Sequence, residues 1–313
     1  MNLSVVIPLF NEQENIEPML EELVAVLGSL EKSYEIILVD DGSRDRTYEL
    51  ACLQAESNRQ IKLLRLRRNF GQTAAMAAGF DHASGDVVIP MDGDMQNDPR
   101  DISRLLDMVD EGYDVVSGWR KGRKDAFVSR KLPSMIANRI ISRTTGVALR
   151  DYGCTLKAYR REVLSQVNLY GELHRFVPAL ASMIGARITE IPVNHRERER
   201  GVSKYGIDRT LRVVLDLITV KFLLKYSTRP MQLFGKWAFS TFVVSLLSGS
   251  MTLYMKLVEG LSMNRNPLLV LTAFLLFMSV QFVVMGLLGE LVTRIYHEVQ
   301  EKTIYTVRES MNL

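Results

Sequence analysis

Residues 87–96 read VVIPMDGDMQ, an apolar run that ends abruptly in Asp92, Asp94 and Gln96. The apolar part has the composition of a buried strand. The three polar residues then stand at alternate positions, where two carboxylates and an amide can offer oxygen ligands to a hard divalent cation. Such a cation can hold a diphosphate, so the run predicts a nucleotide-sugar site. Because Asp and Gly also form turns, the run by itself is also consistent with an ordinary polar loop.

The same unit, a short apolar run followed by polar residues, recurs through the first part of the chain. Runs typical of strands cover residues 3–9, 34–40, 61–66, 87–91 and 114–118. Between them, helical periodicity covers residues 16–27, 46–57, 72–83 and 101–109. This alternation predicts an α/β fold with a doubly wound, mostly parallel sheet. Ligands of such sheets bind beyond the carboxyl ends of the strands.

Polar residues do follow each of the first four predicted strands. The endings read PLFNE at 8–12, DDGS at 40–43, RRNFGQ at 67–72 and DGDMQ at 92–96. An Asp at a strand end can accept a hydrogen bond from a base or a ribose hydroxyl, and Arg68 can meet a phosphate. The four endings together therefore predict a nucleotide pocket. The sequence has no Gly-x-Gly-x-x-Gly fingerprint and no Walker loop, which disfavours dinucleotide oxidoreductases and P-loop NTPases.

The composition narrows the class of protein. With 39 basic and 36 acidic side chains among 313 residues, the chain has no charge excess that favours nucleic-acid binding. Cys52 and Cys154 are the only cysteines, and they stand too far apart to indicate a disulfide framework or a zinc site. No signal peptide is visible at the N-terminus, so we expect the first domain to stay in the cytoplasm.

Two later segments predict membrane helices. Residues 237–255 and 267–289 contain no Asp, Glu, Lys or Arg, and as helices they would be roughly 28 and 34 Å long, enough for a bilayer core of about 30 Å. The alternative is a buried hairpin of a soluble core. Basic residues are in excess on the side of the first domain, which predicts that both termini are cytoplasmic. Residues 209–226 have amphipathic helical spacing and predict either a helix in the membrane interface or one packed on the core.

In this order, the strand endings resemble those of family 2 glycosyltransferases, which have the GT-A fold. Later motifs resemble the bacterial polyprenyl-phosphate members of that family: DYGC at 151–154, YRR at 159–161, EIPV at 190–193, GVSKY at 201–205 and the terminal hairpin. The resemblance covers nearly the whole chain. It implies inverting transfer of one sugar from a UDP-sugar to undecaprenyl phosphate at the bacterial inner membrane, for cell-envelope glycan modification, and assembly as a homotetramer.

The resemblance also assigns residues. Asp92, Asp94 and Gln96 would hold Mg²⁺ or Mn²⁺, and Asp94 and Asp151 would be catalytic. The chain departs from the family at Gly93 and Met95, where Ala and Leu are more common, but neither departure removes a ligand. The residues predicted to bind the nucleotide sugar are Pro8, Phe10, Asn11, Glu12, Asp40, Asp41, Arg68, Asn69, Gly71, Gln72, Asp92 and Gly93.

The acceptor side can be reasoned from charge. A phosphate monoester has its second pKa near about 6, so a lipid phosphate is largely ionised at neutral pH and needs little help to lose a proton. The harder task is to bring this anion beside an anionic diphosphate, which calls for cations. The predicted acceptor-phosphate residues are Arg120, Arg130, Lys131, Arg200, Ser203, Lys204 and Tyr205. For residues 120–131 a solvated surface loop is the alternative.

We therefore expect a cytoplasmic GT-A domain over residues 1–205, an interfacial helix and linker over 206–231, two transmembrane helices within 232–294 (at 233–258 and 267–292) and a cytoplasmic tail over 295–313. Two other hypotheses stay open. A processive polysaccharide synthase would need more spans and usually carries a Gln-x-x-Arg-Trp motif, which this sequence lacks. A non-enzymatic two-span binding protein would have no use for the metal and nucleotide endings.

Overall fold

The computed structural model describes residues 2–121, 142, 146–167, 169, 173–196, 230–262, 266–299 and 304–313. The chain divides into two compact units. The first joins Met1–Val220 with Thr303–Leu313, and the second is Lys221–Lys302. The helix predicted at residues 209–226 lies outside the described residues.

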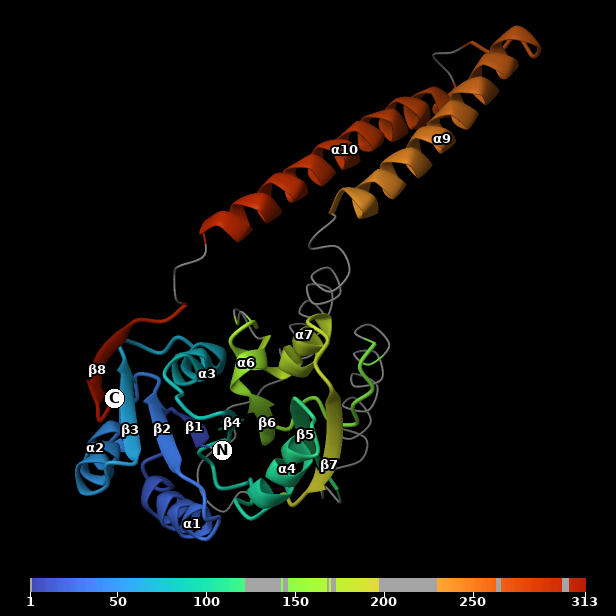
Figure 1. The fold of residues 1–313 in the computed structure, drawn as a ribbon. Coiled ribbons are helices and arrows are strands. Elements are labelled where there is room, and N and C mark those ends of the chain that lie inside the picture. Colours follow the sequence, from blue (N-terminus) through green and yellow to red (C-terminus); the bar gives the residue numbers. More distant parts are fainter. Residues whose placement is uncertain are drawn as a thin grey trace. The chain divides into compact units, whose positions relative to one another are not determined.

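Eight strands of the described chain form one sheet in the first unit (Figure 1). They are β1 (Leu3–Leu9), β2 (Tyr34–Asp40), β3 (Ile61–Leu66), β4 (Val87–Pro90), β5 (Val115–Arg120), β6 (Lys157–Arg160), β7 (Ile188–Val193) and β8 (Val307–Met311). Their order is β7-β5-β6-β4-β1-β2-β3-β8. The pairs β1–β2, β1–β4, β2–β3 and β5–β7 are parallel, whereas β6 is antiparallel to β4 and β5, and β8 is antiparallel to β3. The predicted doubly wound, mostly parallel sheet is confirmed.

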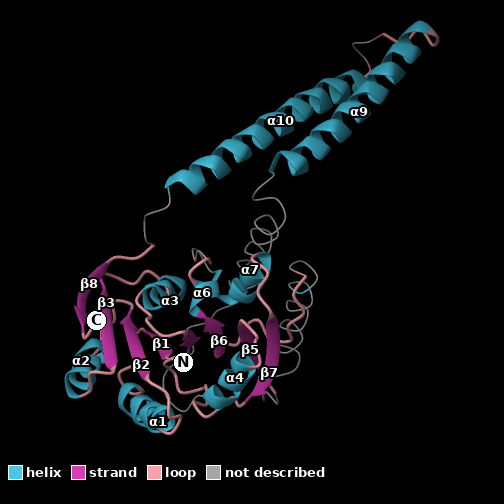
Figure 2. Cartoon of the chain, in the orientation of Figure 1, coloured by secondary structure: helices cyan, strands magenta, loops and turns pink. Residues whose placement is uncertain are grey.

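Helices cover both faces of this sheet (Figures 1 and 2). One face carries α1 (Ile16–Gly28), α2 (Thr47–Ser57) and α4 (Asp101–Asp110), and the other carries α3 (Gln72–Asp81), α6 (Arg161–Leu164) and α7 (Val177–Met183), which follows a 3₁₀ turn at Leu173–Phe176. Small residues let α3 lie unusually close to β1: a Cβ at Gly79 would stand 2.2 Å from the Val6 Cγ1 atom. This close packing holds the C-terminal half of α3 against β1.

The strand order reverses at β1. The chain builds β1, β2 and β3 outward in one direction and then places β4 on the opposite side of β1. The carboxyl ends of β1, β2 and β4 therefore lie at a topological switch point, where doubly wound sheets open a crevice for their ligands. The polar endings that the sequence predicts belong to these strands and to β3.

The second unit is a hairpin of α9 (Pro230–Leu257) and α10 (Pro267–Val299) (Figure 1). Its segments Met231–Leu257 and Pro267–Gly289 are long and apolar enough to cross a membrane. Polar side chains face the partner helix: the Ser245 hydroxyl donates to the Thr272 carbonyl at 2.9 Å, and the Ser279 hydroxyl donates to the Ala238 carbonyl at 2.9 Å.

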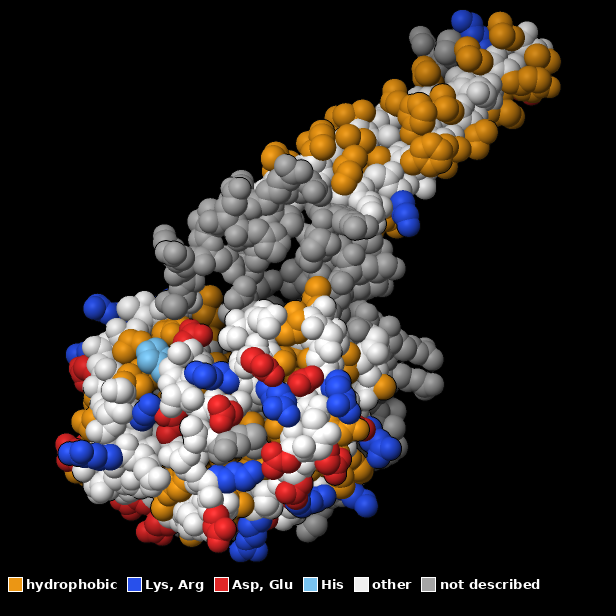
Figure 3. Space-filling view, viewed as in Figure 1, with side chains coloured by type: hydrophobic (Ala, Val, Ile, Leu, Met, Phe, Trp, Pro, Cys, Tyr) orange, Lys and Arg blue, Asp and Glu red, His pale blue; other side chains and the backbone are white. Residues whose placement is uncertain are grey.

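Large apolar side chains of the hairpin point outward instead (Figure 3). Phe239 is 70% exposed and Val270 is 73% exposed. An arrangement with hydroxyls inside and large apolar groups outside is favourable in lipid, where polar groups must find partners within the protein.

Candidate active site

Asp92 lies two residues after the end of β4, and both of its carboxylate oxygens accept hydrogen bonds. Gln72 Nε2 donates to one oxygen at 2.9 Å, and the Thr155 hydroxyl donates to the other at 2.7 Å. Gln72 begins α3, while Thr155 precedes β6, so the carboxylate joins two separate segments. Burial, and next the negative charge of Asp94, raise the pKa of Asp92 to about 6. A cation placed beside the two carboxylates would relieve this repulsion.

The loop after Asp92 is held close to β1. A Cβ at Gly93 would stand 2.7 Å from the Leu9 Cδ2 atom, so the departure from Ala at this position permits a close approach. Met95 has a left-handed backbone with φ 60°. This turn brings the Gln96 amide N–H to an Asp94 carboxylate oxygen at 3.2 Å, while Gln96 Nε2 donates to the Arg196 carbonyl at 3.4 Å. The carbonyl oxygen of the Gln96 side chain is left as its ligand atom.

The donor set fits a magnesium-type site. Within the part of the chain that the structure describes, no group of three or more His, Cys, Asp or Glu side chains is placed to share a cation. Magnesium does not require one, since it is commonly bound through one or two carboxylates together with substrate phosphates and water. Asp92, Asp94 and Gln96 supply two carboxylates and an amide oxygen. Their role as metal ligands stays a prediction.

The endings of β1 and β2 interlock. The Ser43 hydroxyl accepts the Asn11 backbone N–H at 3.0 Å, and the Asn11 side chain accepts the Arg44 N–H at 2.8 Å. Asp40 is fully buried; burial raises its pKa, and its nearest cation, Arg65, lies 3.8 Å away at Nε. A buried carboxylate with spare acceptor capacity at a strand end is suited to a base N–H or a ribose hydroxyl.

Asp41 holds the ending of β3 in place. Its two carboxylate oxygens accept the backbone N–H groups of Phe70 at 2.7 Å and Gly71 at 2.9 Å. Burial nevertheless raises the pKa of Asp41 to about 6. Arg68 and Asn69 are exposed, and the Arg68 guanidinium lies 4.3 Å from the centre of the Phe70 ring. The structure thus gathers the four predicted endings at one edge and gives Asp41 a further role in shaping the loop.

Arg120, the last residue of β5, forms an ion pair with Asp151, and its charge also acts on Asp92. Arg120 Nε lies 2.6 Å and Nη2 2.9 Å from the two oxygens of Asp151. Burial alone would raise the pKa of Asp151, but the pair with Arg120 outweighs it and lowers the pKa. Burial would likewise lower the pKa of Arg120, and the pair raises it instead. The predicted catalytic carboxylate and a predicted phosphate-binding cation therefore meet each other in this structure.

Comparison with known proteins identifies the family. Residues 4–167 match the family model for glycosyl transferase family 2. The chain belongs to this family. It is 42% identical over 313 residues to the dodecaprenyl-phosphate galacturonate synthase of Rhizobium johnstonii. The matched region covers 99% of this chain and 93% of that protein. It is 40% identical over 312 residues to the undecaprenyl-phosphate 4-deoxy-4-formamido-L-arabinose transferase of Edwardsiella ictaluri, with 98% and 93% covered.

The expected resemblance to polyprenyl-phosphate glycosyltransferases is confirmed by these relatives. The motifs RNFGQ at 68–72, DYGC at 151–154 and KY at 204–205 are those in which the sequence resembles the formamido-arabinose transferases. Among solved structures, glucosyl-3-phosphoglycerate synthase from Mycobacterium tuberculosis in complex with Mn²⁺, UDP and phosphoglyceric acid has a TM-score of 0.54. It is 18% identical and covers 70% of this chain and 78% of that one, a likeness that concerns the fold.

Two residues of this family 2 site are absent from the sequence-based prediction. Thr155 binds Asp92, and the buried Lys157 donates from its ammonium group to the carbonyls of Tyr152, at 3.3 Å, and Cys154. The alternation of polar and apolar residues from Thr155 through Lys157 is the signal that could have indicated a strand here.

Arg196, which stands four residues before the predicted phosphate ligand Arg200, is already paired. Arg196 donates to both carboxylate oxygens of Glu22, at 2.7 and 2.6 Å, and lies 3.0 Å from Asp98. The positive charge of Arg196 is thus neutralised by carboxylates of the first unit. The other predicted acceptor residues, Arg130, Lys131, Arg200, Ser203, Lys204 and Tyr205, lie outside the described residues.

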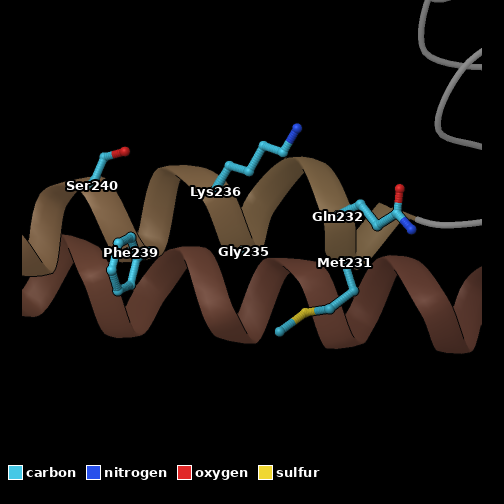
Figure 4. Close-up of a pocket in the computed structure, with 6 residues that line it drawn as sticks. All are labelled: Met231, Gln232, Gly235, Lys236, Phe239 and Ser240. Atoms are coloured by element: carbon cyan, nitrogen blue, oxygen red, sulfur yellow. The ribbon is translucent and has the colours of Figure 1, made fainter.

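A shallow hollow on α9 belongs to the second unit alone (Figure 4). Gly235 is one of its lining residues, while Lys236 and Ser240 point away from α10 and Met231 points toward it. The remaining lining residues are Gln232 and Phe239. None of them is a predicted donor-site residue of this glycosyltransferase, so the hollow is a separate feature of the helix surface.

Proposed function

We propose that this family 2 glycosyltransferase moves one sugar, with inversion, from a UDP-sugar to polyprenyl phosphate at the cytoplasmic face of the bacterial inner membrane. One observation carries the proposal. The same chain combines the Asp92 site at the switch point of the sheet with a two-helix hairpin, and the chain segments before and after that hairpin both belong to the catalytic unit. The two relatives with 42% and 40% identity are named for a polyprenyl phosphate but for different sugars. The acceptor class is therefore better supported than the sugar.

The donor side follows from charge. Asp92, Asp94 and Gln96 would hold Mg²⁺ or Mn²⁺, which when bound stabilises the negative charge on the departing diphosphate. Asp40 and the loop shaped by Asp41 bind the nucleotide. The hydrogen bonds from Gln72 and Thr155 fix the Asp92 carboxylate before the donor arrives. Such preorganisation spares the site a reorganisation during the reaction.

The acceptor side needs cations more than a base. The lipid phosphate arrives ionised, and its oxygen attacks the anomeric carbon on the face opposite the diphosphate. Asp151 is predicted as a base by resemblance, but its ion pair with Arg120 lowers its affinity for a proton. We propose that Asp151 instead orients Arg120 toward the incoming phosphate. The further phosphate ligands would be Arg130, Lys131, Arg200, Ser203, Lys204 and Tyr205.

The transfer assay tests this proposal directly. The full-length chain in detergent micelles is incubated with polyprenyl phosphate, Mg²⁺ and a series of radiolabelled UDP-sugars that includes UDP-linked uronic acids and formamido-pentoses. We expect one labelled lipid product, with one sugar per lipid, from at least one donor. We also expect Asp94→Ala to abolish its formation, because that change removes a predicted metal ligand.

The alternatives give different results in the same assay. A labelled polymer would identify a processive synthase. Failure of every donor to label the lipid, in a chain that is folded and binds no UDP, would favour a non-enzymatic membrane protein and overturn the proposal.

A further inference from the structure

Lys157 is a buried cation whose partners are backbone carbonyls. It is the first residue of β6, and only 2% of it is exposed to solvent. Its ammonium group donates to the carbonyls of Tyr152 and Cys154. Among the described residues, no carboxylate lies within ion-pair distance of it. Burying a charged ammonium costs free energy, and burial correspondingly lowers the pKa of Lys157. A position that only had to fill space would be better served by a neutral side chain.

The two carbonyls belong to a turn that carries the working groups of the site. At its start, Asp151 binds Arg120 in the two-point ion pair and also accepts the Gly153 N–H at 3.1 Å. At its end, Thr155 donates to Asp92 at 2.7 Å. Lys157 ties this turn between those two residues. Its positive charge also faces the carboxylates of Asp151 and Asp92 at longer range.

We propose that Lys157 is a positioning residue of the donor site, which holds the 151–156 turn so that Thr155 fixes the Asp92 carboxylate and Asp151 fixes the Arg120 guanidinium. The role rests on the proposed function. It gives one buried side chain control over groups on both the donor side and the acceptor side. Outer groups of this kind commonly change metal affinity or activity by about 10- to 100-fold when they are replaced.

The same strand offers a matched control. Arg160 also uses a cationic head to donate to backbone carbonyls, those of Val109 at 2.8 Å and Tyr113 at 3.3 Å. It lies three residues further along β6 and makes its ion pair with Asp114, outside the site. Arg160→Met removes carbonyl hydrogen bonds from β6 without touching the 151–156 turn.

A double-mutant cycle tests the proposal. Lys157→Met, Thr155→Val, the double variant and Arg160→Met are prepared as full-length chains in micelles, and UDP binding in the presence of Mn²⁺ is measured by calorimetry alongside the transfer rate. We expect Lys157→Met and Thr155→Val each to weaken UDP binding by about 10-fold and the rate by about 10- to 100-fold. If Lys157 acts through Thr155, the double variant will be no worse than Lys157→Met alone. Arg160→Met is expected to bind UDP and transfer sugar as wild type does, even if it lowers the melting temperature.

Other outcomes decide against the proposal. Losses that multiply in the double variant would show that Lys157 and Thr155 act independently, and an equal loss in Arg160→Met would reduce Lys157 to a general support of β6. If Lys157→Met does not fold, Lys157→Gln replaces it in the cycle; its shorter, uncharged side chain keeps a donor, so a smaller loss with the same non-additive pattern against Thr155→Val is expected, and losses that multiply would again contradict the proposal. If the wild-type chain transfers no sugar, the proposed function fails, but the cycle in UDP binding still tests Lys157.

Discussion

At the scale of single residues, the pKa of Asp151 differs from those of Asp41 and Asp92 because its partner is a cation. Asp41 accepts two backbone N–H groups and Asp92 two neutral side-chain donors, and burial raises the pKa of each to about 6. Asp151 faces a guanidinium, which outweighs burial and lowers its pKa. Near neutral pH the first two are poised to respond to a ligand or a change of pH, whereas Asp151 stays ionised.

Asp41 should make the stability of the chain depend on pH. Its pKa of about 6 in the folded chain exceeds the value of about 3.9 in an unfolded one, so the folded chain binds this proton more tightly. The resulting stabilisation is fully present below about pH 4 and is lost as the pH rises through about 6. We therefore expect the melting temperature of wild type, minus that of Asp41→Asn, to increase as the pH is lowered from 7 to 5.

The same scan with a surface aspartate serves as the control. Asp107 is an exposed residue of α4, so Asp107→Asn controls for the removal of one carboxylate from the surface. A difference between wild type and Asp41→Asn that does not change across the range would contradict the raised pKa. Differential scanning fluorimetry in buffers of constant ionic strength is sufficient for the comparison.

At the scale of elements, the sequence predicts β1 to β5 and α1 to α4 to within two residues at each end, because each buries a clear apolar pattern. It does not predict β6, β7 or β8. The first is four residues long, β7 is mostly half-buried, and β8 reads VRESM, an edge strand with polar side chains. Thr155 and Lys157 went unpredicted for the same reason: their role depends on the antiparallel insertion of β6 between β4 and β5, which no local pattern specifies.

The C-terminal strand should stabilise the first unit through Asn312. Its side-chain amide donates to the carbonyls of Ala55, at 2.7 Å, and Ile61, at 2.9 Å, and its backbone is left-handed with φ 62°. Asn312→Ala removes both hydrogen bonds and adds backbone strain, so we expect a loss of about 1–3 kcal/mol. Asn312→Gly removes the bonds but tolerates the backbone, and should lie between wild type and Asn312→Ala.

Thermal unfolding of wild type, Asn312→Gly and Asn312→Ala gives the order of their stabilities. Equal melting temperatures for all three would mean that β8 does not depend on this anchor. A Gly variant less stable than the Ala variant would contradict the strain argument specifically.

At the scale of the whole molecule, the chain passes through the apolar hairpin and then returns to the unit it left. Residues 303–313 belong with residues 1–220, since β8 pairs with β3 and the Tyr48 hydroxyl donates to Glu309 at 2.7 Å. A hairpin that crosses a bilayer twice must begin and end on the same side. The pairing of β8 thus supports placing the segments before and after the hairpin on the same side of the membrane, while the choice of the cytoplasmic side rests on the basic residues.

Cysteine accessibility tests this topology. Leu261, in the turn between α9 and α10, is 46% exposed, and Leu313 at the C-terminus is 52% exposed. Leu261→Cys and Leu313→Cys are each introduced into a chain that also carries Cys52→Ala and are produced in cells that are then converted to spheroplasts. A membrane-impermeant maleimide should label Leu261→Cys but not Leu313→Cys in intact spheroplasts. Both positions should be labelled after detergent lysis. The native Cys154 can remain, because it is 1% exposed and burial raises the pKa of its thiol to about 11, which keeps it unreactive at neutral pH. Labelling of Leu313→Cys in intact spheroplasts would place the C-terminus outside the cell and contradict the proposed topology. Protection of both positions until lysis would show that the hairpin does not cross the bilayer.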